Sequence, residues 1–263
     1  MTTRAPAVAG TFYPARPDEL RAAIGAATTD AVAAPPDAPV PKILVVPHAG
    51  YVYSGPVAAS GFALLDPVRD RVERVVLLGP SHRVWFEGMA VSGADAFDTP
   101  FGPIPVDDEL RERVRTLPGV IVDDRPHRDE HSLEVELPFL QVALDRFTLL
   151  PISVGDAPSD AVAAVIDAVW GGPETLIVVS TDLSHYHAYD EARRIDAATC
   201  AAIVAAREDR IGDRAACGAR PLRGALRVAG RRGLAVRQID VRTSGDTAGD
   251  RHRVVGYGSF AIG

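Results

Sequence analysis

Three of the seven histidines in this chain come directly after an apolar, β-branched run. His48 follows K-I-L-V-V-P, His82 follows V-V-L-L-G-P-S, and His185 follows L-I-V-V-S-T-D-L-S. An open α/β sheet binds its ligands in the crevice beyond the carboxyl ends of its strands, so side chains from separate strands converge there. The sequence therefore predicts one site that contains all three imidazoles. The competing interpretation is that each strand simply ends in a polar residue.

A thiolate would complete a three-ligand metal site with His48 and His82, and the two cysteines differ in their surroundings. Cys200 lies in the apolar stretch A-A-T-C-A-A-I-V-A-A, where a buried thiol is ordinary packing. Cys217 lies in R-A-A-C-G-A-R-P, between arginines that would favour the thiolate. Two imidazoles and one anion leave open positions on a metal, as in non-haem iron and catalytic zinc sites.

Two further pairs of residues are candidates for proton transfer. Asp182 and His185 form D-x-x-H, in which the carboxylate would fix the tautomer of a histidine that acts as general base. His185 as a further metal ligand is the alternative. His131 and Glu134 lie one helical turn apart and could face the same crevice from the start of a helix. A solvated acidic first turn explains them as well.

Other motifs in the chain are weaker. Residues 127–131 match the H-x-x-E-H pattern of inverted zinc proteases, which needs both histidines on one helix. The first turn after Pro126 has no apolar face, so we expect a helix to start nearer His131. The chain contains no G-x-S-x-G elbow and no P-loop, which disfavours serine hydrolases and nucleotide hydrolases.

Short apolar runs alternate with helical patterns along the chain, which is typical of a largely parallel sheet covered by helices. We expect an α/β fold with a mostly parallel central sheet, helices on both faces and an antiparallel C-terminal strand pair. The predicted strands lie near 43–47, 74–79, 88–92, 148–154 and 175–180. The predicted helices cover 18–27, 55–66, 107–116, 131–145, 159–170 and 188–207. Residues 28–41 are rich in Ala and Pro and are predicted to form a surface loop.

Composition restricts the classes of partner. At 263 residues and 47% hydrophobic content, the chain can form one α/β domain over residues 1–263. A formal net charge of −7 disfavours binding to nucleic acid or to an anionic membrane. The N-terminal residues contain no apolar signal segment, so the expected compartment is the cytoplasm.

The chain resembles the Memo family, whose prokaryotic members are called AmmeMemoRadiSam system protein B, over essentially its full length. The matching segments are R-x-P-A-V-A-G-T-F-Y-P, V-P-H-A-G-Y-V-Y-S-G-P-V-A-A, L-L-G-P-S-H, D-E-H-S-L-E-V-E-L-P-F-L-Q, P-I-S-V-G, S-T-D-L-S-H-Y and A-C-G-x-x-P. The resemblance implies a fold similar to that of class III extradiol dioxygenases. It implies His48, His82 and Cys217 as metal ligands, with Asp182 and His185 beside them. It also implies an AMMECR-type protein and a radical SAM enzyme as partners.

The resemblance does not transfer ring cleavage of a catechol, because extradiol enzymes use a carboxylate where this chain would offer an oxidisable thiolate. The leading hypothesis is a metal-dependent redox protein that activates dioxygen or a small phenolic or carbonyl substrate. Iron is the first choice of metal, with copper or zinc as alternatives. The rival hypotheses are a non-enzymatic module that binds a peptide or small molecule in the crevice, and a zinc-dependent hydrolase.

Overall fold

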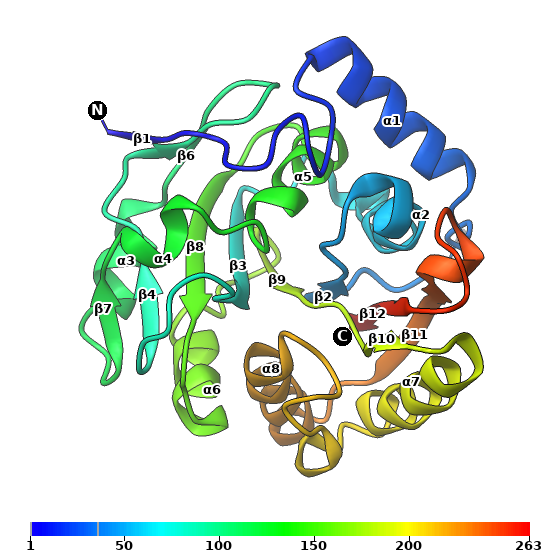
Figure 1. Cartoon of the computed structure of the whole chain (residues 1–263). Coiled ribbons are helices and arrows are strands. Elements are labelled where there is room, and N and C mark those ends of the chain that lie inside the picture. The colour runs from blue at the N-terminus through cyan, green and yellow to red at the C-terminus, as the bar shows by residue number, and fades with distance from the viewer. Residues whose placement is uncertain (1, 36) are drawn as a thin grey trace.

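Four parallel strands form the centre of the main sheet in the computed structural model, which describes residues 2–35 and 37–263. In spatial order they are β2 (Ile43–Val46), β9 (Thr175–Ser180), β3 (Arg74–Pro80) and β8 (Thr148–Val154). All four read as continuous apolar runs because helices cover both faces of the sheet (Figure 1). Their carboxyl ends therefore meet at one edge, where the loops that follow can build a site.

Antiparallel strands extend this sheet on both sides. On the side of β8, β4 (Met89–Val91) is antiparallel to β8 and parallel to β7 (Val120–Val122). On the side of β2, β12 (Val254–Ile262) is antiparallel to β2, and both β10 (His185–His187) and β11 (Val236–Thr243) are antiparallel to β12. The antiparallel C-terminal strand pair is thus confirmed.

A second, smaller sheet brings the N-terminal segment beside the middle of the chain. Its order is β1 (Thr3–Arg4), β5 (Ala96–Phe97) and β6 (Ile104–Pro105). The pairing of β1 with β5 places Arg4 close to the segment that precedes His131, which matters for the site described below.

Two apolar clusters lie on opposite faces of the main sheet, because successive strand residues point to opposite sides. Val75 and Leu77 belong to one cluster, and Val76 and Leu78 belong to the other. The first face is covered by α1 (Pro17–Thr29), α2 (Tyr51–Phe62) and α5 (Leu137–Ala143). The other face is covered by α3 (Asp108–Val114), α6 (Ser159–Ala168), α7 (Tyr189–Val204) and α8 (Ala219–Arg232). The short α4 (Arg125–Arg128) and the 3-10 turns η1 (Ala63–Val68), η2 (Glu134–Glu136), η3 (Glu208–Arg210) and η4 (Ser244–Asp246) complete the elements.

The α/β class with helices on both faces is confirmed, but three local predictions differ from the structure. The predicted helix 131–145 is a turn followed by η2 and α5, so His131 lies in the turn and not in a helix. Residues 125–128, which we expected to be non-helical, form α4, with Pro126 in its first turn. The helix predicted at 55–66 begins at Tyr51 and gives way to η1 after Phe62.

Two predictions include residues that the structure does not describe. Residues 1 and 36, which the predicted domain 1–263 includes, lie outside the described residues, and residue 36 also falls in the predicted loop 28–41. Over the described part of the chain, we find no helix that is both long and apolar enough to cross a membrane.

Candidate metal centre

Three imidazoles converge at the carboxyl edge of the parallel strands. His48 lies two residues beyond β2, His82 lies two residues beyond β3, and His131 comes from the turn between α4 and η2. One potential ligand atom from each ring lies within 4.8 Å of those of the other two. The ring centroids of His82 and His131 are 4.6 Å apart and nearly stacked, and His48 meets both rings edge-on. The structure therefore groups His131, which we expected in a catalytic role, with two of the predicted metal ligands.

Buried hydrogen bonds fix the orientation of His48. Its Nδ1 lies 2.7 Å from the hydroxyl oxygen of Ser180, the last residue of β9. That hydroxyl also lies 2.7 Å from the carbonyl oxygen of Ser132 and 2.7 Å from the Glu136 carboxyl. Burial raises the pKa of Glu136 well above its ordinary value, which favours a neutral carboxyl that can donate to Ser180. With Nδ1 occupied in this way, Nε2 of His48 is the nitrogen left for a metal ion.

Glu130 connects the other two histidines. Its carboxylate lies 2.9 Å from Nδ1 of His82 and 3.2 Å from Nδ1 of His131. It also accepts hydrogen bonds from the backbone N–H groups of His82, His131 and Ser132. Burial acts to raise the pKa of Glu130, but the hydrogen bond and charge of His82 and the backbone donors outweigh it and lower this pKa to about 2. Glu130 is therefore a permanent anion behind two of the three imidazoles.

Cys217 lies against His48 from a different side. Its Sγ is 3.2 Å from Nε2 of His48 and accepts from the backbone N–H of Asp182 at 3.2 Å. The close approach depends on Gly218, because a Cβ at that position would lie 2.7 Å from the carbonyl oxygen of Ser180. Burial is the largest cause of the raised pKa of the Cys217 thiol, and the charge of Asp182 adds to it. A bound cation would reverse that preference by coordinating the thiolate.

We expected the flanking arginines to favour the thiolate of Cys217, but they are not among the causes that set the pKa of this thiol. Arg220 forms an ion pair with Asp156 instead, with a distance of 3.0 Å between the charged groups. Cys200 is buried in the apolar cluster on the face covered by α3, α6, α7 and α8, as its sequence surroundings indicated.

The predicted pairing of Asp182 with His185 was wrong. Asp182 accepts a hydrogen bond of 2.8 Å from the backbone N–H of His48, and burial raises the pKa of this carboxyl to about 7. Nδ1 of His185 lies 2.8 Å from the carbonyl oxygen of Leu183. That carbonyl, and not the carboxylate, sets the tautomer of His185 and leaves its Nε2 as an acceptor. Residues 181–184 form no helical turn, so a D-x-x-H spacing alone does not bring the two side chains together.

Glu134 lies with the N-terminal segment and does not line the crevice. Its buried carboxylate pairs with Arg4, accepts from the backbone N–H groups of Ala7 and Val8, and accepts from the Tyr13 hydroxyl at 2.6 Å. The expected helical spacing from His131 is lost because residues 131–133 form a turn. Through these contacts, Glu134 binds the N-terminal segment to the segment that carries His131.

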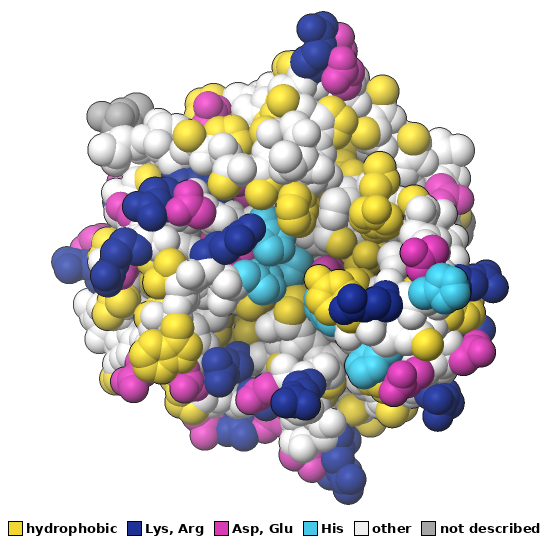
Figure 2. Space-filling model, in the orientation of Figure 1, with side chains coloured by type: hydrophobic (Ala, Val, Ile, Leu, Met, Phe, Trp, Pro, Cys, Tyr) yellow, Lys and Arg dark blue, Asp and Glu magenta, His cyan; other side chains and the backbone are white. Residues whose placement is uncertain are grey.

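The three histidines and His185 open into a cavity of about 660 Å³. Figure 2 shows imidazole side chains gathered in a hollow on this face, with basic side chains on both sides of it. Asp182, Tyr53 and Tyr257 also line the cavity, as does the loop before β12. A small molecule placed there would reach both the histidine group and His185.

The donor set fits a transition-metal ion. Burial is the main cause that lowers the pKa of His48, and it lowers that of His131 to about 4, so at neutral pH each ring is neutral and has one nitrogen with a free lone pair. Second partners on Nδ1 of His48 and His82 leave Nε2 available, which is the arrangement that metal-binding histidines adopt. Within the described parts of the chain, His48, His82 and His131 are the group of potential ligands whose mutual distances suit a metal ion.

Sequence reasoning did not predict the contacts that support the histidines. Glu130, Ser180 and Glu136 each act through a contact between segments far apart in the chain. Glu130 had one usable signal, since it directly precedes His131. Ser180 had another, because it is the polar last residue of an otherwise apolar strand.

Comparison with known proteins gives one consistent result. The family model described as Memo-like protein matches residues 4–261. A MEMO1 family protein of Aquifex aeolicus is 36% identical, with 98% of each chain covered, and one of Sulfolobus acidocaldarius is 33% identical, with 99% of each covered. An uncharacterized Escherichia coli K12 protein of known structure aligns with a TM-score of 0.49 and 16% identity, over 84% of this chain and 99% of that one. On the family match and these full-length relatives, the chain belongs to the Memo-like protein family.

Proposed function

We propose that this chain is a metal-dependent redox protein that holds one divalent transition-metal ion on His48, His82 and His131. Cys217 is an additional donor on the side of His48. The observation that carries the proposal is the convergence of three imidazoles within 4.8 Å, next to an open cavity. The distance of 3.2 Å between Sγ of Cys217 and Nε2 of His48 suits two ligands of one ion, given metal–ligand bonds of about 2.0 to 2.3 Å.

Iron(II) is the metal that this donor set favours for redox work. Neutral imidazoles and a thiolate suit iron, and an ion with six positions keeps some of them open towards the cavity. When bound, the ion would supply a redox-active Lewis acid for a small phenolic or carbonyl substrate, or for dioxygen. The protein contributes the second layer of hydrogen bonds: Glu130 holds His82, and Ser180 holds His48.

His185 is the residue that we assign to proton transfer. Its Nδ1–H donates to the Leu183 carbonyl, so Nε2 can accept a proton from a molecule in the cavity and return it. Burial lowers the pKa of His185 below its ordinary value, which keeps the ring neutral and ready to act as a base.

Metal binding by single-residue variants tests the proposal. Metal-free protein is loaded anaerobically with iron(II), and the bound metal is measured by mass spectrometry and by competition with a chelator. We expect one iron per chain in the unchanged protein, and we expect His48→Ala, His82→Ala and His131→Ala to lower the affinity by more than about 100-fold, beyond the effect of losing a supporting residue. His185→Ala and the control Cys200→Ser should retain the metal.

Other outcomes of the same measurement would contradict specific parts. Stoichiometric zinc without affinity for iron would favour a hydrolase, and no metal at all would favour a binding module. A site that is emptied by Cys217→Ser but kept by His131→Ala would make His48, His82 and Cys217 the ligand set. Loss of metal in His185→Ala equal to that in His48→Ala would make His185 a ligand.

A further inference from the structure

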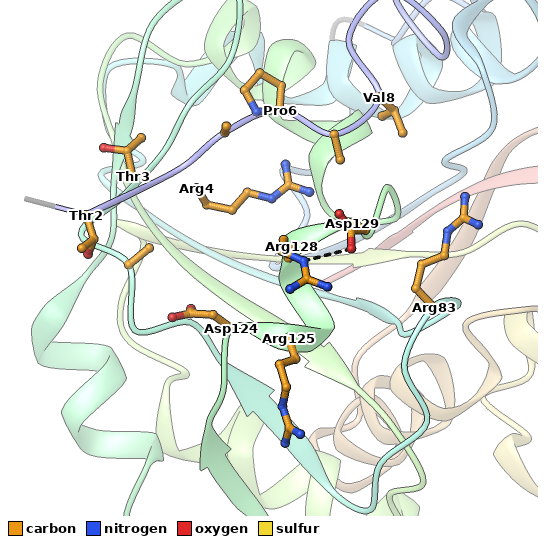
Figure 3. Close-up of a pocket in the computed structure, with 13 residues that line it drawn as sticks. Thr2, Thr3, Arg4, Pro6, Val8, Arg83, Asp124, Arg125, Arg128 and Asp129 are labelled. Atoms are coloured by element: carbon orange, nitrogen blue, oxygen red, sulfur yellow. Dashed lines mark hydrogen bonds and ion pairs between the residues drawn. The ribbon is translucent and has the colours of Figure 1, made fainter.

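An arginine without an acidic partner lies beside the histidine group. Arg83 lines both the histidine cavity and a neighbouring pocket of about 840 Å³. In that neighbouring pocket, Arg125 pairs with Asp123 at 2.6 Å and Arg128 pairs with Asp129 at 3.0 Å. Figure 3 shows the Arg128 pair, with Arg83 apart from it and joined by no dashed line to another residue drawn. Among the residues that the structure describes, no carboxylate oxygen lies within 4 Å of the Arg83 guanidinium nitrogens.

A second arginine without an acidic partner in the described chain, Arg253, also lines the histidine cavity. The guanidinium carbon of Arg253 is 5.1 Å from the centre of the Tyr186 ring, which is 63% exposed. Tyr186 has a φ of +63°, a conformation that a bulky side chain rarely adopts and that tends to occur at functional sites. The nearby Asp250 carboxylate accepts from the backbone N–H of His252 at 2.8 Å, and no ion pair joins it to Arg253 in the described chain.

Both of these cations line the cavity that contains the histidine group. The formal net charge is −7, and most arginines of the structure pair with a carboxylate. Guanidinium groups that lack an internal partner at the edge of a cavity are suited to a carboxylate or a phosphate, which they bind through charge-assisted hydrogen bonds.

We propose that the cavity binds a small molecule with a carboxylate or phosphate group, which Arg83 and Arg253 hold while the rest of the molecule reaches the histidine group. This inference rests on the proposed function, because it names the substrate class of the same site. The stacking of Arg253 on Tyr186 holds one cation in place before the ligand arrives. Arg83, which directly follows His82, brings the second cation to the edge of the metal site.

A charge series on one metal-binding ring tests the inference. The iron-loaded protein is titrated anaerobically, by calorimetry, with catechols that carry a carboxyl, a phosphonate or a methyl group at the same ring carbon. We expect at least one of the two anionic compounds to bind about tenfold or more tightly than the methyl compound. The preferred anion distinguishes a carboxylate ligand from a phosphate ligand. This preference should shrink as salt is raised, because partly exposed charges are screened.

Arginine variants locate the preference. Arg83→Gln and Arg253→Gln should each lower affinity for the preferred anionic catechol about tenfold, and leave the affinity for the methyl compound unchanged. Arg125→Gln is the matched control, since its guanidinium is already paired with Asp123, and it should change neither affinity. Equal binding of all three catechols, or full anion preference in both variants, would overturn the inference while leaving the metal site intact.

A measurement without metal separates this inference from the proposed function. Metal-free protein is titrated with inorganic phosphate and with acetate at low ionic strength, and the chemical shifts of the histidine rings are followed by NMR. Saturable binding of at least one anion that the Arg83→Gln, Arg253→Gln double variant loses would support the cationic pair even if no metal binds. No saturable binding of either anion, together with no charge preference among the catechols, would refute it.

Discussion

At the residue scale, one carboxylate organises two of the three imidazoles. Glu130 is 2% exposed and accepts hydrogen bonds from three backbone N–H groups as well as from Nδ1 of His82. Glutamine at this position keeps the size of the side chain but loses one acceptor oxygen and the charge. His82 would then lose the anion that holds its Nδ1, and His131 would lose the negative charge that lies 3.2 Å from its Nδ1.

We therefore predict that Glu130→Gln lowers iron affinity by about 10- to 100-fold, the usual effect of losing a partner of a metal-binding histidine. The matched control is Glu134→Gln, four residues along the same segment. Glu134 pairs with the buried Arg4, so its replacement should lower the free energy of unfolding by about 3 to 5 kcal/mol. Its metal affinity should stay unchanged at temperatures where the variant is folded. Both are measured by chelator competition and by denaturant unfolding, and equal metal affinity in the two variants would contradict the role of Glu130.

Among the site residues, the sequence indicated most directly those that follow a strand. His48, His82 and His185 were predicted to share a site because the carboxyl ends of parallel strands lie together, and all three line the same cavity. The contacts of Glu130 and Ser180 could not be predicted, because each depends on which loop lies opposite which strand end. The partner of Asp182 was missed for the same reason, since it is a backbone N–H from another strand's loop.

At the scale of elements, the turn that carries His131 is packed tightly on the end of β3. A Cβ on Gly79 would lie 2.8 Å from a methyl carbon of Leu133 and 3.0 Å from the hydroxyl oxygen of Ser132. Glycine at this position therefore lets the segment after His131 approach the strand that leads to His82. The distance between these two imidazoles depends on that approach.

We predict that Gly79→Ala lowers the free energy of unfolding by about 1 to 3 kcal/mol, as overpacking of a core does, and weakens metal binding by moving His131. Gly25→Ala is the matched control, because its added Cβ meets nothing within 4 Å on the exposed side of α1. That change should raise the free energy of unfolding by about 0.5 to 1 kcal/mol, since alanine favours a helix over glycine. Denaturant unfolding measures both values, and a neutral Gly79→Ala would show that the turn is free to shift.

The elements that the sequence predicted best are the buried strands. Each of the five predicted strands overlaps an observed one, because continuous β-branched runs between loops suit little else. The amphipathic helix α8 was missed, although Leu222, Ala225, Leu226 and Ala229 recur at helical spacing. Its two glycines and Pro221 masked the pattern. The short β1, β5 and β6 have no periodic signal at all, since two residues cannot show one.

At the scale of the whole molecule, His127 lies where the N-terminal segment, the small sheet and the main sheet meet. Arg4 donates to its carbonyl oxygen, its ring packs edge-on against Phe97, and its Nε2 lies 3.0 Å from the carbonyl oxygen of Ala90 in β4. Nδ1 is buried and has no hydrogen-bond partner in the described chain. Protonation of this ring would therefore place a charge in the contact between the two sheets. We expect it to lower the free energy of unfolding of the whole fold.

Burial lowers the pKa of His127 from 6.5 to about 4, against the weaker opposing effects of the Ala90 carbonyl, Asp124 and Asp123, while Arg4 adds to the lowering. A histidine with a lowered pKa in the folded state contributes stability above its unfolded pKa, and this contribution is lost as the pH falls from about 6.5 towards 4. We predict that, between pH 7 and pH 5, the unchanged protein loses about 2 kcal/mol of unfolding free energy relative to His127→Gln, whose amide can still donate to Ala90 but cannot titrate. The comparison cancels every other titrating group, including the site histidines. Urea unfolding at several pH values measures the difference, with the exposed His252→Gln as control. If the free energy of unfolding of the unchanged protein and of His127→Gln varied with pH in parallel, the contact between the sheets would tolerate the charged ring. Acid sensitivity would then arise elsewhere in the molecule.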